Sequence, residues 1–203
     1  MIANLFYINQ LQCMDFGQLG RVLGLKNLDL VKRLVSTKYL ESELTQILQS
    51  HLPACDEDKL SVVGSAIMAA SLDRIQILSR RAAVLLAAEV VLNMTRGSDW
   101  RELAAWCDVE NLLEWLRLKP EYRIIKLKIP VDLGLPVRDL YSGYIFRHIV
   151  GMLPPGYIEW FLMRLPDGVL GLRDVGIIHE VDRESFDGIL QHSLKADVGC
   201  KMK

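Results

Sequence analysis

Residues 82–92 read AAVLLAAEVVL, and this stretch decides the fold. A membrane-spanning helix needs about 20 apolar residues. This run is about half that long and is interrupted by Glu89, so it predicts a helix buried in a protein core. The helix is expected to run from about Leu72 to Thr95 and to lie in the middle of the fold, because its centre is apolar on nearly every face. Gly97, which lacks a Cβ, suits the left-handed residue after a helix end.

Helical spacing continues on both sides of this stretch. Before it, Asn27 predicts an N-cap, and a break near residues 36–37 predicts a bend or two consecutive helices. Asp56 predicts the cap of a further helix. The apolar residues of the first two stripes recur at intervals of three and four: Leu28, Val31, Leu34, Val35, Leu40, Leu44, Ile47 and Leu48. After it, short helices are expected from Ser98, after a cap at Asp108, and around residues 141–152, 157–165 and 185–194. The chain is therefore predicted to be mainly α.

Residues 120–137 differ in character from the rest. Three prolines punctuate them, and Ile125 and Leu127 alternate with Lys126 and Lys128. This alternation predicts a short strand or extended connector around residues 123–130. We expect a single helical domain over residues 1–203, in which 120–137 is either an internal boundary or a loop crossing one domain.

The charge balance argues against a dedicated nucleic-acid-binding protein. The chain has 24 Lys and Arg residues and 25 Asp and Glu residues, a net charge of -1, whereas such proteins carry a basic excess that displaces phosphate counterions. The two short helices expected between Ser98 and Lys119 resemble a helix-turn-helix. However, Glu110 and Glu114 on the second helix would repel phosphate.

The cysteines predict neither a zinc site nor a redox pair, because no two of them form a CxxC pattern. They are Cys13, Cys55, Cys107 and Cys200. Residues 1–4 lack the charged start of a secretory leader. Scattered thiols without a leader are typical of a reducing compartment. A cytoplasmic protein is therefore expected, peripheral to any membrane and not inserted in it.

No recognised catalytic motif is present. The chain has neither a GxSxG elbow nor a GxxxxGK[ST] phosphate loop. His179 and Glu180 begin like HExxH, but Arg183 stands where the second histidine is required. His148 falls on an apolar stripe, where a packed histidine is favoured over a catalytic base. We expect no enzyme activity, no cofactor and no metal; a small enzyme of unrecognised family, using His148 or His179, stays open as an alternative.

Three tryptophans lie close together on the short helices: Trp100, Trp106 and Trp115. They either fill the core or bind a partner, since buried Trp residues dominate many interface energies. Trp100 lies off the stripe formed by Leu103 and Trp106. It is therefore predicted to be the exposed, partner-binding member.

Three segments carry a family resemblance. Residues 6–11, FYINQL, resemble a Tyr-[Ile/Leu]-[His/Asn] motif; the apolar helix is followed by Arg101-Glu102-Leu103; and residues 143–166 end in Arg164-Leu165-Pro166, where the family has Arg-x-Leu-Pro. Together they resemble the cytosolic sorting-platform adaptors of bacterial type III secretion, the SctK family. The resemblance covers about two thirds of the chain.

This resemblance implies a helical, non-enzymatic adaptor. It would link an inner-membrane ring protein to the pod protein of the secretion apparatus. Phe6 and Tyr7, which precede the first convincing helix, then become predicted partner-binding residues together with Trp100. A chaperone-like or regulatory binding protein outside secretion stays open as an alternative.

Overall fold

The computed structural model describes residues 10–56, 59–93, 97–119, 124–127, 135–166, 179–181 and 183–199. Over these ranges the chain is mainly α, as predicted. Its internal contacts divide it into two compact units. The first comprises Met1–Leu72 and Val150–Leu172, and the second Asp73–Ile149 and Arg173–Lys203. Residues 120–137, for which an internal boundary and a loop crossing one domain were both left open, fall inside the second unit, and the single domain stays a prediction.

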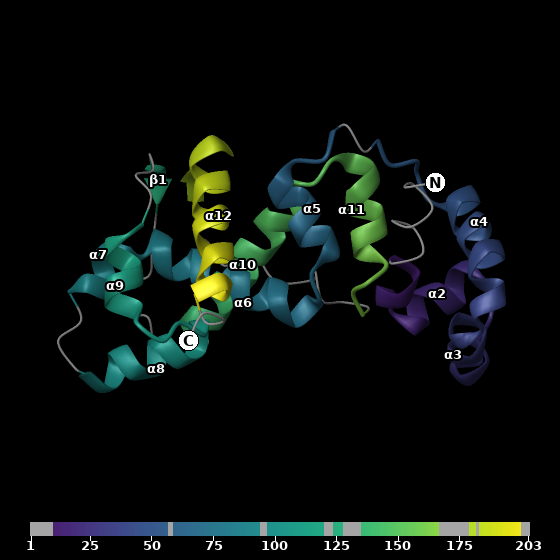
Figure 1. Cartoon of the computed structure of the whole chain (residues 1–203), viewed down its shortest axis with the longest axis horizontal. Helices are drawn as coiled ribbons and strands as arrows, with labels where there is room; N and C mark the ends of the chain where they lie inside the picture. Colours follow the sequence, from purple (N-terminus) through teal and green to yellow (C-terminus); the bar gives the residue numbers. More distant parts are fainter. Residues whose placement is uncertain are drawn as a thin grey trace. The chain divides into compact units, whose positions relative to one another are not determined.

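The first unit is built almost entirely from helices. They are α2 (Phe16–Val22), α3 (Leu28–Ser36), the 3-10 turn η1 (Lys38–Leu40), α4 (Glu41–His51), α5 (Val62–Ala69) and α11 (Pro155–Leu162). The predicted break near residues 36–37 is confirmed, because α3 ends at Ser36 and α4 follows η1. In Figure 1, α2, α3 and α4 lie together.

Side-chain caps fix the ends of α2 and α3. Asp15 accepts hydrogen bonds from the backbone of Gly17 and Gln18, at 2.9 and 3.1 Å. Asn27 is the N-cap of α3, as predicted, and accepts from the amides of the second and third residues after it. The two helices meet where Gly20 has no Cβ: an added Cβ would lie 2.7 Å from the Leu25 carbonyl oxygen.

The start of α5 corrects one expectation. Its N-cap is Ser61, whose hydroxyl accepts from the Gly64 amide at 3.0 Å, and not Asp56. Asp56 instead forms a local ion pair of 2.9 Å with Lys59. Asp56 lies six residues before α5 and is paired with Lys59, so its carboxylate does not cap the free amides of the first turn.

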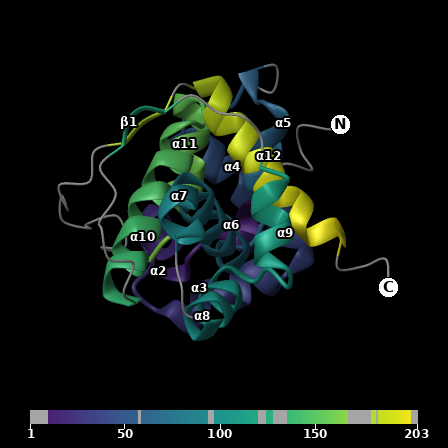
Figure 2. The ribbon, with the colours of Figure 1, turned by 90° about the vertical axis from the view of Figure 1, so that its left-hand side faces the viewer.

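The second unit contains the central apolar stretch. Its elements are α6 (Leu72–Leu86), α7 (Ala88–Leu92), α8 (Gly97–Cys107), α9 (Leu112–Arg117), β1 (Ile124–Leu127), α10 (Leu135–Gly151), β2 (His179–Val181) and α12 (Arg183–Gly199). In Figure 2, α6 lies behind α7 and between α10 and α9. All residues from 81 to 88 are buried, so the predicted core position is confirmed.

The expected single helix from Leu72 to Thr95 is wrong in its length. The regular helix is interrupted at Ala87, although the amide of Ala87 still bonds the Ala83 carbonyl and the Val91 amide still bonds the Ala87 carbonyl. After the interruption Glu89 is exposed, so its carboxylate stays hydrated. Gly97 begins α8 instead of closing the preceding helix.

Asp108 ends a helix instead of capping the next one. Its φ is 55°, in the left-handed region that Asp tolerates better than most residues. The amide of Val109 reaches back to the Ala104 carbonyl at 3.0 Å, a bond typical of a helix C-terminus. The N-cap of α9 is Asn111, which accepts from the Glu114 amide.

The described part of the predicted extended connector, residues 124–127, is a strand. β1 pairs antiparallel with β2, with Ile124 opposite Val181 and Leu127 opposite His179. His179 and Glu180, considered above for an HExxH helix, therefore lie in a strand. None of the helices within the described ranges has the length and apolarity that crossing a membrane requires.

Candidate functional site

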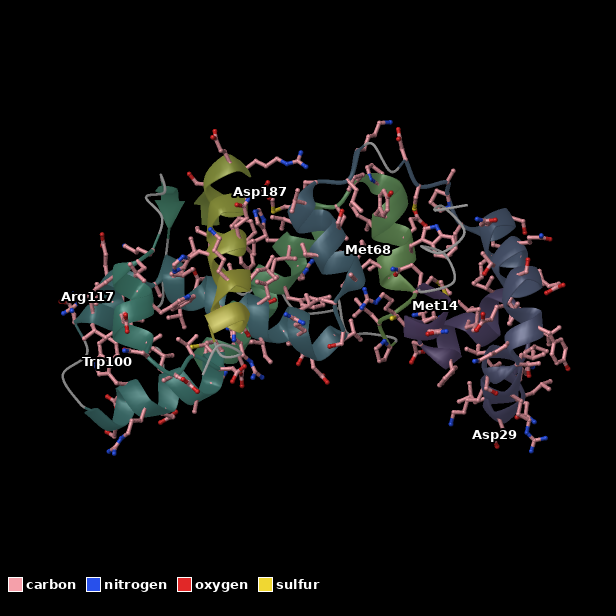
Figure 3. The ribbon with its side chains drawn as sticks, in the orientation of Figure 1. Met14, Asp29, Met68, Trp100, Arg117 and Asp187 are labelled. Atoms are coloured by element: carbon pink, nitrogen blue, oxygen red, sulfur yellow. The ribbon has the colours of Figure 1, made fainter. Side chains whose placement is uncertain are left out.

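The structure describes only one of the three predicted partner-binding residues. Phe6 and Tyr7 lie outside the described residues. Trp100, labelled in Figure 3, lies in the first turn of α8 and is half-buried, not fully exposed as predicted. Its role in binding a partner stays a prediction.

Trp106 is fixed in place by polar contacts. Its indole Nε1–H donates to Asp139 Oδ1 of α10 at 3.0 Å. The guanidinium of Arg80 lies 5.5 Å from its ring centroid and donates to its carbonyl at 3.3 Å. Trp106 therefore joins α6, α8 and α10 of the second unit, and we assign it to the scaffold.

Trp115 also belongs to the scaffold. It is buried in α9 and stacks on His192 of α12, with 5.4 Å between ring centroids and 25° between ring planes. His192 Nε2 also lies 3.2 Å from the Trp115 carbonyl oxygen. Figure 2 shows the two helices that this stack joins. Trp106 and Trp115 are therefore assigned to the scaffold, and the binding role of Trp100 stays a prediction.

A buried arginine holds the end of α8. Arg81 of α6 is 3% exposed. It donates to the carbonyls of Cys107 at 3.0 Å, Asp108 at 2.7 Å and Ser193 at 3.1 Å, and it lies 3.3 Å from Asp108 Oδ2. A cation at a helix C-terminus satisfies carbonyls that have no partner within the helix. Sequence reasoning did not single out Arg81.

The first unit has a similar arrangement. Arg164 is 2% exposed and donates to the carbonyls of Met68 and Ala70 at the end of α5. Its guanidinium lies 5.0 Å from the Phe161 ring centroid. Burial lowers the pKa of Arg164 from its ordinary value. Met68, buried and labelled in Figure 3, also accepts from Gln10 Nε2 at 3.0 Å.

The candidate catalytic histidine is packed. His148 meets the Phe186 ring edge to face, with 4.7 Å between centroids and 88° between planes. Burial lowers its pKa below the ordinary value of 6.5. The same effect raises the pKa of the buried Cys107 thiol to about 12, against the opposing influence of Arg81. A thiol in this state is a poor nucleophile.

Exposed apolar side chains mark a surface on the first unit. Leu28 is 48% exposed, Leu30 43% and Tyr39 80%. We call these three residues the α3–η1 surface, because they lie on α3 and the adjoining turn. The sequence places Leu28 on one apolar stripe with Val31, but only Val31 of α3 is buried. The spacing of apolar residues identifies one face of a helix, but it does not show whether another part of the protein covers that face.

The second unit has its own exposed apolar residues. Leu118, directly after α9, is 69% exposed, and Leu113 within α9 is 40% exposed. We call this pair the α9 surface. Arg117 beside it is labelled in Figure 3 and is exposed. Isolated exposed leucines are common on proteins. We consider the α9 surface further because the first unit also has an exposed apolar surface.

Within the described ranges, no group of three His, Cys, Asp or Glu residues is arranged to hold a metal ion. Comparison with known proteins adds no relative: no family model, curated protein or solved structure matches the chain.

Proposed function

We propose that this chain is a non-enzymatic adaptor that docks two proteins at once. The observation that carries the proposal is that each of its two units has its own exposed apolar surface: α3–η1 on the first and α9 on the second. Buried aromatic and aliphatic side chains supply most of the energy of protein interfaces. Tyr39 and Leu118, the most exposed of these residues, are the expected centres.

The partners follow from the resemblance of residues 6–11, 101–103 and 143–166 to the SctK family. We propose that they are the inner-membrane ring protein and the pod protein of a bacterial type III secretion apparatus, and that the chain works in the cytoplasm. Phe6, Tyr7 and Trp100 are proposed as further contact residues.

The test is a pair of variants measured against both purified partners. Y39A/L30S removes the centre of the α3–η1 surface, and L113S/L118S removes the α9 surface. Each substitution replaces an exposed side chain, so both variants are expected to melt like the parent chain. Each should lose binding to one partner by about 2 kcal/mol or more and retain the other. Unchanged binding of both partners by both variants would refute the proposal.

The N-terminal segment is tested separately. F6A/Y7A is expected to weaken binding to one partner by about 2 kcal/mol or more while the chain still melts cooperatively. If F6A/Y7A still binds both partners, Phe6 and Tyr7 are not part of the interface, and W100A is the next variant to measure.

A further inference from the structure

The balanced total charge of the chain hides a basic segment. Residues 21–38 contain five Lys or Arg residues and one Asp, a net charge of +4, although the whole chain carries -1. The other residues together therefore carry -5. The five cations are all exposed: Arg21, Lys26, Lys32, Arg33 and Lys38. A concentration of exposed positive charge attracts a partner of opposite sign.

This basic segment coincides with the α3–η1 surface. Leu28 and Leu30 lie within it, and Tyr39 follows it directly. Val31, which is 0% exposed, fixes α3 to its unit. Lys32 reaches toward α2, where its Nζ lies 5.8 Å from the Phe16 ring centroid. Apolar side chains and cations are thus interleaved on one part of the first unit.

Helix geometry places Arg33 on the outer side of α3 and Lys32 on its flank. At 3.6 residues per turn, Leu28 and Leu30 lie about 200° apart around the helix. Arg33 lies about 160° from the buried Val31, on the outward face between the two leucines. Asp29, four residues before Arg33, lies about 160° from Val31 on the other side. The outermost line of α3 therefore carries one acidic and one basic side chain, and the leucines flank it on either side.

We infer that the α3–η1 surface recognises an acidic segment of a partner protein, in which Asp or Glu residues alternate with apolar side chains. The inference rests on the proposed adaptor function and identifies the chemistry of one partner. Acidic side chains would meet Lys32 and Arg33, and apolar ones would cover Leu28, Leu30 and Tyr39. Such complementarity sets specificity and association rate more than it sets affinity.

Two other anionic surfaces fit less well. A bilayer favours a helix whose outermost line is apolar, whereas that line of α3 carries Arg33. A nucleic-acid backbone supplies phosphates for the cations but gains little from exposed leucines. An acidic protein segment supplies carboxylates for the cations and apolar side chains for the exposed leucines and Tyr39.

The test uses the purified cytoplasmic domain of the inner-membrane ring protein and the purified pod protein as probes. K32E/R33E is expected to weaken binding of one partner by about tenfold or more and to leave the other unchanged. If K32E/R33E does not melt cooperatively, K26E/K38E replaces it as the charge-reversal variant, because both of its changes lie outside α3. The same loss of binding is expected. The matched control R183E/K195E reverses two exposed cations of the second unit, and its binding should stay within about twofold of the parent. Raising the salt concentration should weaken the parent complex and not the K32E/R33E complex.

The outcomes separate this inference from the proposed function. If the parent chain binds neither partner, both are overturned. If it binds both, and neither charge reversal nor salt changes the affinity, the acidic partner is overturned and the adaptor is retained. Binding of the parent chain, but not K32E/R33E, to phosphatidylserine vesicles, with unchanged protein binding, would assign the surface to a membrane and overturn the inference.

Discussion

Arg81 donates a hydrogen bond of 3.1 Å from Nη1 to the backbone carbonyl of Ser193, 112 positions further along the chain. The same guanidinium bonds the carbonyls of Cys107 and Asp108. One side chain thus joins α6, the end of α8 and α12. Arg81 is a buried charged residue that joins three helices of the second unit, beside the buried Ser79 and Ser193.

Replacing Arg81 with Met is expected to destabilise the chain by about 3 kcal/mol or more, because two buried carbonyls and a part-buried one lose their charged donor. Chemical denaturation gives the free energy of unfolding. R101M, at an exposed arginine of α8, is the matched control and should stay within about 0.5 kcal/mol of the parent. Equal stability of both variants would show that Arg81 does not support this unit.

A glycine pair tests the packing of the first unit. An added Cβ at Gly156 would lie 2.6 Å from the Ala54 carbonyl oxygen, whereas one at Gly151 meets nothing within 4 Å. G156A is therefore expected to lower the melting temperature, with a loss of about 2 kcal/mol. G151A should be neutral or slightly stabilising, because Ala is the better helix former. Similar melting of the two variants would contradict the close approach of α11 to residue 54.

The pH dependence of stability should contain a contribution from His148. Burial lowers its pKa below 6.5 in the folded chain, so the unfolded chain binds the proton more tightly. Stability is then complete above about pH 6.5 and is lost as the pH falls through the folded pKa. H148Q should show a smaller loss between about pH 7 and pH 5, with H51Q, at an exposed histidine, as the control. If H148Q loses as much stability as the parent chain over this pH range, a residue other than His148 causes the pH dependence.

The cysteines should differ in reactivity. Cys107 is buried with a pKa raised to about 12, whereas Cys13 is exposed. At about pH 8, iodoacetamide should label Cys13 in the native chain and reach Cys107 only after unfolding, because the thiolate is the reactive form. Peptide mass spectrometry locates the label. Early modification of Cys107 would mean that α8 opens readily.

The mainly helical fold follows from local signals. Asn27 caps α3, and the alternation around Ile125 and Leu127 marks the strand β1, because these signals are carried by neighbouring residues; the pairing of β1 with β2 has no such local signal. The break at Ala87 and the left-handed Asp108 were not predicted. Asp108 is held by Arg81, a residue 27 positions away. Such contacts have no signature in the spacing of a single helix.

The candidate surfaces were only partly predictable for a related reason. Leu28 shares an apolar stripe with Val31, and yet it is 48% exposed where Val31 is 0% exposed. Periodicity identifies a face that needs covering, but not whether the chain itself or a partner covers it. The net charge of -1 likewise concealed the basic segment, because an acidic remainder cancels it.

The adaptor proposal is tested most directly by the mass of the complex formed when the chain is mixed with both partners. Size-exclusion chromatography with light scattering measures this mass. We predict one species containing all three proteins, because the α3–η1 and α9 surfaces lie on different units. Two separate binary complexes that displace each other, or no complex with either partner, would contradict it.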